Sequence, residues 1–139
     1  MNWIERLNTA INYMEENMAG ELNFSKIAKV ADCSTYHFQR MFIYMTDIPL
    51  SEYIRRRQMT LAVADLKKDG AKVIDVALKY GYDSPSGFNR AFQSVHGIAP
   101  SLVKHDGVAV KSYPPISFQI SIKGVDGLNY RIEKKRLFA

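Results

Sequence analysis

Cysteine is nearly absent from this chain of 139 residues, since Cys33 stands alone. A single cysteine excludes an intramolecular disulfide framework and a zinc cage built from cysteines only. The three histidines, His37, His96 and His105, match no known zinc-ligand spacing, so no metal and no cofactor is expected. The sequence also lacks a glycine-rich phosphate loop and any constellation of paired carboxylates, and so we do not expect an enzyme.

Long apolar runs are missing as well. None approaches the roughly 20 residues of a membrane span. The first five residues contain no basic segment leading into an apolar stretch, so a secretory signal is not expected. These absences favour a cytoplasmic protein with no membrane partner.

Most of the excess positive charge lies in the last part of the chain. The whole sequence has 19 Lys and Arg against 14 Asp and Glu, a net charge of +5. Residues 1–106 carry 13 basic and 12 acidic side chains, whereas residues 107–139 carry 6 and 2. A nucleic-acid surface in the first part must therefore depend on where the charges lie and not on their sum.

Apolar residues recur at helical spacing through most of the chain, which predicts an all-α fold. Ser and Asn residues stand where helices are expected to begin, and such residues are favourable N-caps. The pattern predicts a first helix ending near Gly20, a long helix over about 49–68, and N-caps at Asn23, Ser34 and Ser84.

The apolar period changes to two after Gly107. Ile116, Phe118, Ile120 and Ile122 alternate with polar residues, and 128–132 alternates again, which predicts a short β tail. One or two strands cannot bury a face alone. The tail is therefore expected to begin a domain that is mostly missing, or to pair with another chain in a dimer.

The helical part contains an internal repeat with an offset of about 50 residues. Each copy consists of a short helix with a small Ala, a tight turn, a Ser cap and a helix with the pattern Phe-x-Arg-x-Phe. This is the plan of a helix-turn-helix unit. Ile27-Ala28 matches Val76-Ala77, and Ser34, Phe38, Arg40 and Phe42 match Ser84, Phe88, Arg90 and Phe92.

The outward face of the second helix in each copy carries side chains that can bind DNA. Arg can pair with guanine and Gln or Asn with adenine in the major groove, while Ser near a helix N-terminus favours a phosphate. The predicted DNA-binding residues are Thr35, Tyr36, Gln39 and Arg40 in the first copy and Ser84, Ser86, Asn89, Arg90 and Gln93 in the second.

Two such faces in a repeated architecture favour sequence-specific binding of double-stranded DNA. Both helices could enter successive segments of the major groove, which repeats about every 34 Å. The alternative is a helical protein- or ligand-interaction module whose polar faces are simply solvated and which does not read DNA. The near-neutral charge of residues 1–106 is the best support for this alternative.

Basic residues on the long helix have two interpretations. Arg55-Arg56-Arg57 point in different directions at helical spacing, so one is expected to be buried beside an acidic residue. The others are either solvated or contact phosphates. Lys67, Lys68 and Lys72 are further candidate phosphate contacts.

Three segments, 34–42, 81–92 and 97–101, carry a family resemblance. At these residues the sequence resembles the DNA-binding domain of AraC/XylS-type bacterial transcription regulators, over about residues 4–104. The resemblance implies two helix-turn-helix subdomains joined by a long helix, promoter binding, and transcription control with RNA polymerase as partner. We also expect a nucleoid-associated protein that acts as an activator, with repression as the alternative that the sequence leaves open.

The base-reading positions of that family correspond here to Tyr36, Gln39 and Arg40, and to Pro85, Ser86 and Arg90. Pro85 has no side-chain donor. Gly87 replaces a larger residue and weakens the start of its helix, at a cost near 1 kcal/mol. The first helix is therefore expected to select sequence more sharply than the second.

The tail resembles the lead-in and first strand of a GyrI-like effector-binding domain, at residues 115–118 and 129–133. The resemblance implies a DNA-binding domain at 1–106 and, at 107–139, a linker and the beginning of a truncated effector-binding domain. A small-molecule effector would then bind through the missing part.

Overall fold

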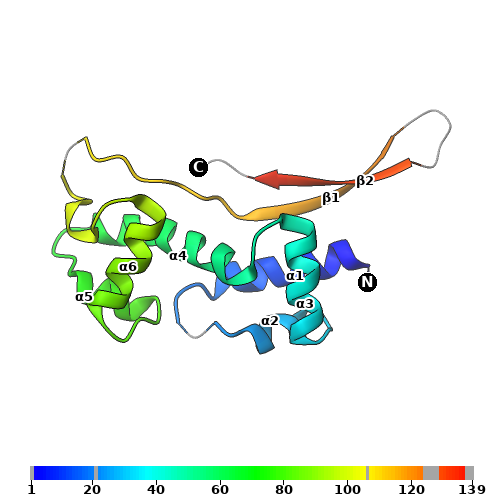
Figure 1. Ribbon diagram of the computed structural model, residues 1–139, viewed down its shortest axis with the longest axis horizontal. Coiled ribbons are helices and arrows are strands. Elements are labelled where there is room, and N and C mark those ends of the chain that lie inside the picture. Colours follow the sequence, from blue (N-terminus) through cyan, green and yellow to red (C-terminus); the bar gives the residue numbers. More distant parts are fainter. Residues whose placement is uncertain (1, 21, 106, 124–128, 137–139) are drawn as a thin grey trace. The chain divides into compact units, whose positions relative to one another are not determined.

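The computed structural model describes residues 2–20, 22–105, 107–123 and 129–136 (Figure 1). The expected all-α class, with two helix-turn-helix subdomains and a short β tail, is confirmed. No helix in these ranges is long and apolar enough to cross a membrane. The elements are α1 (Trp3–Glu16), α2 (Phe24–Val30), α3 (Thr35–Thr46), α4 (Leu50–Leu66), α5 (Val73–Lys79), α6 (Pro85–His96), η1 (Pro100–Leu102), β1 (Ile116–Lys123) and β2 (Asn129–Arg136).

The chain divides into two compact units. Unit 1 contains residues 1–16, 23–50 and 114–139, and unit 2 contains residues 17–22 and 51–113. Each unit includes one copy of the internal repeat.

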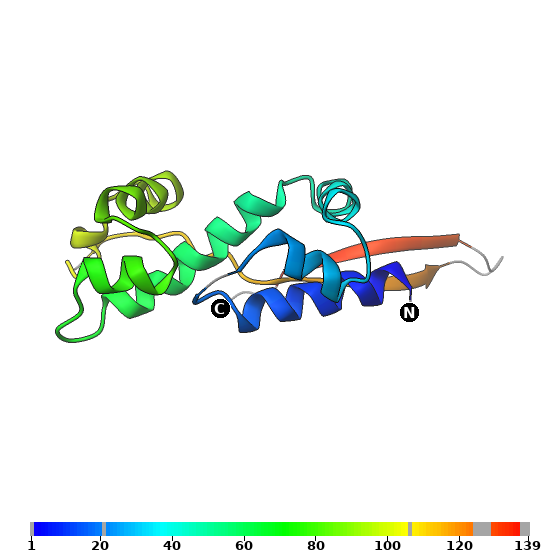
Figure 2. The same ribbon diagram turned by 90° about the horizontal axis from the view of Figure 1, so that it is seen from below.

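The core of unit 1 forms where α1 packs on α2 and α2 packs on α3 (Figure 2). The apolar stripe of each helix is almost completely buried, as the 3.6-residue period requires. The side chains at its centre are Leu7, Ile11, Met14, Ile27, Phe38 and Phe42.

The β tail belongs to unit 1 and forms a hairpin that runs beside α1 (Figure 1). β1 and β2 are antiparallel, from the pair Ile116↔Arg136 to the pair Lys123↔Asn129. Ile116 and Phe118 are buried. The Asn8 amide donates to the Phe118 carbonyl at 2.9 Å and accepts from the Phe118 N–H at 2.9 Å. The sequence alone does not show what buries the apolar face of this β tail, and in the structure helix α1 covers part of it.

Parts of the predicted tail lie outside the described residues. These are Leu128, the turn at 124–127, and Asp106 at the expected domain boundary.

Helix α1 is shorter than predicted, because it ends at Glu16 and not near Gly20. Met18 follows Met14 at helical spacing, and this spacing predicts a longer helix. Met18 is buried, but its backbone belongs to unit 2, where its carbonyl accepts from Gln58 Nε2 at 3.1 Å. The Gly20 N–H donates to the Lys79 carbonyl at 3.1 Å. The backbone groups of Met18 and Gly20 therefore form tertiary hydrogen bonds and not the hydrogen bonds of a longer helix.

The core of unit 2 lies between α4, α5, α6 and the turn after η1. Asp65 on α4 ties this helix to the end of α5, because it accepts from the Tyr80 hydroxyl at 2.5 Å and from Lys79 Nζ at 2.9 Å. The buried apolar residues are Met59, Ala62, Leu66, Val76, Ala77, Tyr80, Phe88, Phe92, Val95 and Val103.

Residues 111–113 form a strap along unit 2. The Lys111 N–H donates to His96 Nδ1 at 3.0 Å, and the Tyr113 N–H donates to Thr60 Oγ1 at 3.0 Å. Arg57 is the buried arginine of the basic run, and it donates to the Tyr113 carbonyl at 2.5 Å. The expectation that one of the three arginines is buried is therefore confirmed, while the expected acidic neighbour stays a prediction, because the contact described for Arg57 is to a backbone carbonyl and Glu52 pairs with Arg55 and Arg56.

Candidate nucleic-acid interface

Both helix-turn-helix turns close with the same backbone hydrogen bond. The Cys33 N–H donates to the Ala28 carbonyl at 3.1 Å, and the Tyr82 N–H donates to the Ala77 carbonyl at 3.0 Å. The residue before each donor has a positive φ, 56° at Asp32 and 84° at Gly81. The sequence repeat is therefore a structural repeat down to the conformation of its turn.

The second helix of each unit begins at the predicted serine. Ser34 Oγ accepts from the His37 N–H at 3.1 Å at the start of α3. Ser84 Oγ accepts from the Gly87 N–H at 3.3 Å at the start of α6. Both helices have 12 residues, and both end at a left-handed residue, Asp47 or Gly97. These two helices are the candidate recognition helices.

Each candidate recognition helix buries one stripe and exposes the opposite face. The stripe of α3 packs in unit 1 and that of α6 in unit 2. A stripe of two aromatic rings and one branched or flexible apolar side chain fixes the rotation of the helix about its axis, and hence the face it exposes. The buried residues are Phe38, Phe42, Met45 and Thr46 in α3, and Phe88, Phe92, Val95 and His96 in α6.

On α3 the predicted DNA-binding residues share the exposed side. Tyr36 is 70% exposed and Arg40 is exposed, while Thr35 and Gln39 are half-buried. Arg40 Nη1 donates to the Tyr36 hydroxyl at 3.2 Å, and the guanidinium carbon lies 5.6 Å from the centre of the Tyr36 ring. This pair is exposed, so a bound anion or base can compete for the guanidinium.

On α6 the predicted residues are also accessible. Ser84, Ser86, Arg90 and Gln93 are exposed and Asn89 is half-buried. Ser84 Oγ is already the N-cap and lies 3.2 Å from Ser86 Oγ. One of the two hydroxyls donates to the other, and the remaining hydroxyl proton is available to a ligand.

The local charge of these faces differs from the near-neutral balance of residues 1–106. Neither α3 nor α6 contains an Asp or Glu, and each presents one exposed arginine. The short helix α2 adds the exposed Lys26 and Lys29. Exposed acidic residues flank both helices, Asp32 and Asp47 beside α3 and Asp83 beside α6, while Glu52 on α4 pairs with Arg55 at 2.7 Å and with Arg56 at 3.1 Å. The exposed faces of α3 and α6 themselves carry arginine and no carboxylate, so their local charge is compatible with nucleic acid although residues 1–106 are nearly neutral.

A hollow of about 290 Å³ lies on the exposed side of α3, within unit 1. Ile43 shares the helical spacing of Tyr36 and Gln39, but the sequence does not predict a hollow formed with the loop before α4. The lining residues are Tyr36, Gln39, Arg40, Ile43, Pro49 and Leu50.

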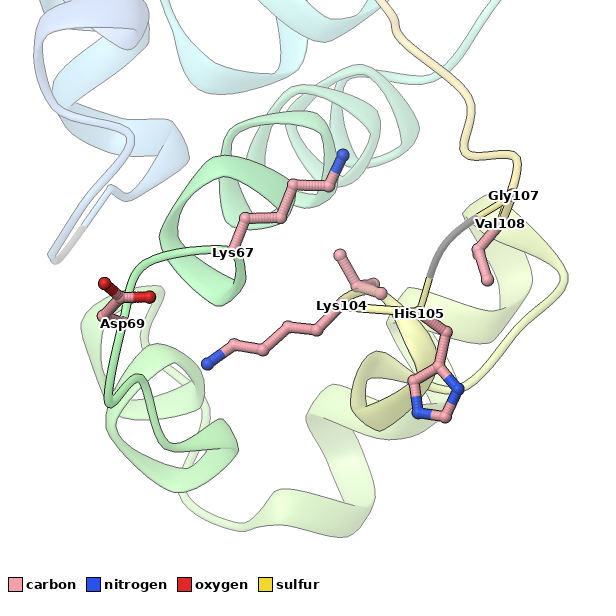
Figure 3. A pocket seen from close by; sticks show the side chains of 7 residues that line it. Lys67, Asp69, Lys104, His105, Gly107 and Val108 are labelled. Atoms are coloured by element: carbon pink, nitrogen blue, oxygen red, sulfur yellow. The ribbon is translucent and has the colours of Figure 1, made fainter.

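A second hollow, of about 520 Å³, lies in unit 2 beside the end of α4 (Figure 3). Lys67, Lys104 and His105 contribute side chains to its lining. Figure 3 shows that the two ammonium groups point in different directions and that the imidazole lies on another side. These groups do not converge on one point, so they resemble separate surface charges more than a binding site for one small anion.

Cys33 and His37 serve packing. The Cys33 thiol lies 3.7 Å from the Ala28 carbonyl, and the His37 ring lies 5.1 Å from the Trp3 ring. Burial is the main cause that raises the pKa of Cys33, which disfavours the reactive thiolate. Across the part of the chain that the structure describes, no group of three or more His, Cys, Asp or Glu could hold a metal ion.

The comparisons with known proteins agree with this geometry. A family model described as a helix-turn-helix domain matches residues 27–105. The HTH-type transcriptional activator AarP of Providencia stuartii is 38% identical over 92 residues, which cover 66% of this chain and 68% of AarP. The regulatory protein SoxS of Salmonella typhimurium is 33% identical over 99 residues, which cover 71% of this chain and 92% of SoxS.

Solved structures share the fold. The AraC-type transcriptional regulator from Chromobacterium violaceum has a TM-score of 0.66 at 21% identity, covering 72% of this chain and 89% of its own. The DNA-binding domain of AdpA, solved in complex with a target DNA, has a TM-score of 0.62 at 20% identity, covering 68% and 86%. The family model over residues 27–105 and the identities to AarP and SoxS show that the chain belongs to the AraC-type family of helix-turn-helix transcription regulators.

Proposed function

We propose that this protein regulates transcription by sequence-specific binding of double-stranded promoter DNA, with α3 and α6 as the two recognition helices. One observation carries the proposal. Arg40 and Arg90 occupy equivalent exposed positions on two helices that begin at equivalent serine caps, and an amide side chain, Gln39 or Asn89, precedes each arginine. Packing of the two helices does not require an amide followed by an arginine at the same exposed position of both.

The side chains divide into two roles. Arg40 and Arg90 carry the guanidinium group that can pair with guanine, while Gln39, Asn89 and Gln93 can pair with adenine. The second role is contact with phosphate oxygens, which fixes register without reading sequence. The residues assigned to it, Thr35 and Ser84, lie at the helix N-termini, while Tyr36 and Ser86 stand at base-reading positions of the family resemblance.

A protection footprint on the DNA upstream of the protein's own gene, at two salt concentrations, tests the proposal. We expect two protected stretches about one helical turn, roughly 34 Å, apart. The logarithm of the binding constant should fall with the logarithm of salt concentration by about 0.9 for each phosphate contact. Absence of protection at low salt would contradict the proposal and favour a helical interaction module.

Two arginine variants and one matched control sharpen the test. Arg40→Ala should lose the pairing with guanine, worth about 1–3 kcal/mol, and should weaken specific binding by roughly 5- to 150-fold. Arg55→Ala is the control for selectivity, because Arg55 pairs with Glu52 on α4 and any phosphate contact that it makes would be lost equally on all sequences. Arg90→Ala should relax selectivity less than Arg40→Ala, since Pro85 offers no donor beside it. Equal loss of selectivity in the two variants would contradict this ranking.

The partners follow from the same proposal. We infer that residues 1–106 act as the DNA-binding domain. We further infer that the protein is an activator with RNA polymerase as a partner, and that it catalyses no reaction. We also infer that residues 107–139 lead into a part that binds a small-molecule effector, and that the protein acts in the cytoplasm, on the nucleoid.

The C-terminal hairpin is the proposed route to a dimer. Light scattering at high concentration tests this last point, and a strict monomer would exclude it.

A further inference from the structure

The two recognition helices differ in chemistry at two of their exposed positions. Tyr36 and Ile43 on α3 correspond to Ser86 and Gln93 on α6, given the 50-residue offset. Tyr36 is 70% exposed and Ile43 is 45% exposed. The first helix therefore presents apolar surface where the second presents only polar groups. Packing does not require this difference, because the buried stripes of α3 and α6 are equivalent.

The apolar surface of α3 is concave. Tyr36, Ile43, Pro49 and Leu50 line the hollow of about 290 Å³ together with Gln39 and Arg40. Leu50 is only 2% exposed and so lies deep, while Ile43 is an exposed wall. Gln39 and Arg40 are also the residues assigned to base edges. The hollow thus lies among the groups that would meet the DNA.

We propose that this hollow receives the 5-methyl group of thymine, so that α3 selects thymine by apolar contact and α6 does not. The inference rests on the proposed function. Thymine is the base that shows a methyl group in the major groove, where the other bases show hydrogen-bonding groups. The exposed Arg40 at the rim and the absence of acidic residues from α3 complement a polyanion. An apolar protein partner would gain nothing from these charges.

The expected size of the effect follows from one methyl group. Removal of a buried methyl group from its contact should weaken binding about four-fold. A pair of thymines that both touch the hollow should give roughly the square of this factor, since well-separated contacts are approximately additive.

The experiment uses the wild-type protein and duplexes selected for binding from a random library. Each thymine of the bound site is replaced in turn by deoxyuridine, which removes only the methyl group. We expect one or two positions in the α3 half-site to lose about four-fold in affinity, and those in the α6 half-site to lose nothing. The half-sites are distinguished by the loss of footprint in Arg40→Ala and Arg90→Ala.

Two variants assign the effect to the hollow. Ile43→Ala should weaken binding to the thymine site and abolish the difference between thymine and deoxyuridine. Gln93→Ala, at the matched position of α6, should leave that difference unchanged. Thermal unfolding checks that both variants are folded, which their exposed positions favour.

Several outcomes overturn the inference. Binding that is insensitive to deoxyuridine in the α3 half-site, or selected sites without a constant thymine there, would refute the assignment of the hollow and leave the proposed function intact. Sensitivity that persists unchanged in Ile43→Ala would place the methyl contact elsewhere. Failure of any duplex to bind would overturn the proposed function, and the hollow's role with it.

Discussion

Acidification should destabilise the protein through His96. This histidine is 6% exposed, and both of its ring nitrogens are used. The Lys111 N–H donates to Nδ1 at 3.0 Å, so Nδ1 has no proton and Nε2 donates to the Met59 carbonyl at 2.9 Å. A second proton on the ring would break the bond to Lys111. Burial lowers the pKa of His96 from its ordinary value of 6.5, the bond to Met59 opposes this, and Lys111 lowers the pKa further.

The sign and size of the effect follow by linkage. Since the folded pKa lies below 6.5, the unfolded chain binds more protons than the folded chain as the pH falls. Stability is therefore fully present above pH 6.5 and is lost as the pH falls toward the folded pKa. One proton changes the unfolding free energy by at most about 1.4 kcal/mol per pH unit, so the loss between about pH 7.5 and 5.5 is at most about 1.4 kcal/mol.

Urea unfolding of the wild type and of His96→Gln, followed by circular dichroism at several pH values, measures this loss. The variant should be less stable at neutral pH by about 1–3 kcal/mol, because one buried backbone group loses its partner. The difference between the two proteins should then shrink below pH 6.5, while effects of the other histidines cancel. A difference that stays constant or grows on acidification would refute the reasoning.

Three further predictions concern stability. Gly87→Ala should raise the unfolding free energy by about 0.5–1 kcal/mol, because a Cβ there would meet Ser84 Oγ and Tyr82 Cδ1 at an ordinary 3.6 Å; a lower melting temperature would contradict this. Asp65→Ala should lower the unfolding free energy by about 3 kcal/mol, because the Tyr80 hydroxyl loses its charged acceptor. An unchanged midpoint of urea unfolding would exclude this role of Asp65. Asn8→Ala should accelerate hydrogen exchange of the Phe118 amide, whereas unchanged exchange would show that α1 does not hold the hairpin through Asn8.

The sequence alone predicts those features of the fold that depend on interactions between residues close together in the chain. Ser34 and Ser84 were recognisable as caps because a hydroxyl can satisfy the free N–H groups of a first turn in any tertiary context. The buried stripes of α3 and α6 followed from the 3.6-residue period. The match of Ile27-Ala28 to Val76-Ala77 predicted the repeated turn, because close helix packing requires a small residue there.

Non-local contacts could not be predicted. Nothing in the spacing of Met18 indicated that it would pack in unit 2 and end α1 early. Helical periodicity puts Asn8 among the polar positions of α1 and does not indicate that its amide binds a residue 110 positions away. The hollow beside α3 needs Pro49 and Leu50 to fold back against the helix, and helical periodicity does not contain this information. The assignment of residues to bases remains a prediction.

The amide of Asn8 acts as a substitute for a neighbouring strand. It offers one acceptor and one donor to the backbone of Phe118, as a strand residue paired with β1 would. Open strand edges invite pairing with other chains and hence aggregation, and proteins commonly protect them. With the second edge of β1 closed in this way at Phe118, strand addition is directed to the outer edge of β2. Any strand added to this sheet would therefore extend it from Asn129–Arg136 and leave the packing of β1 on α1 intact.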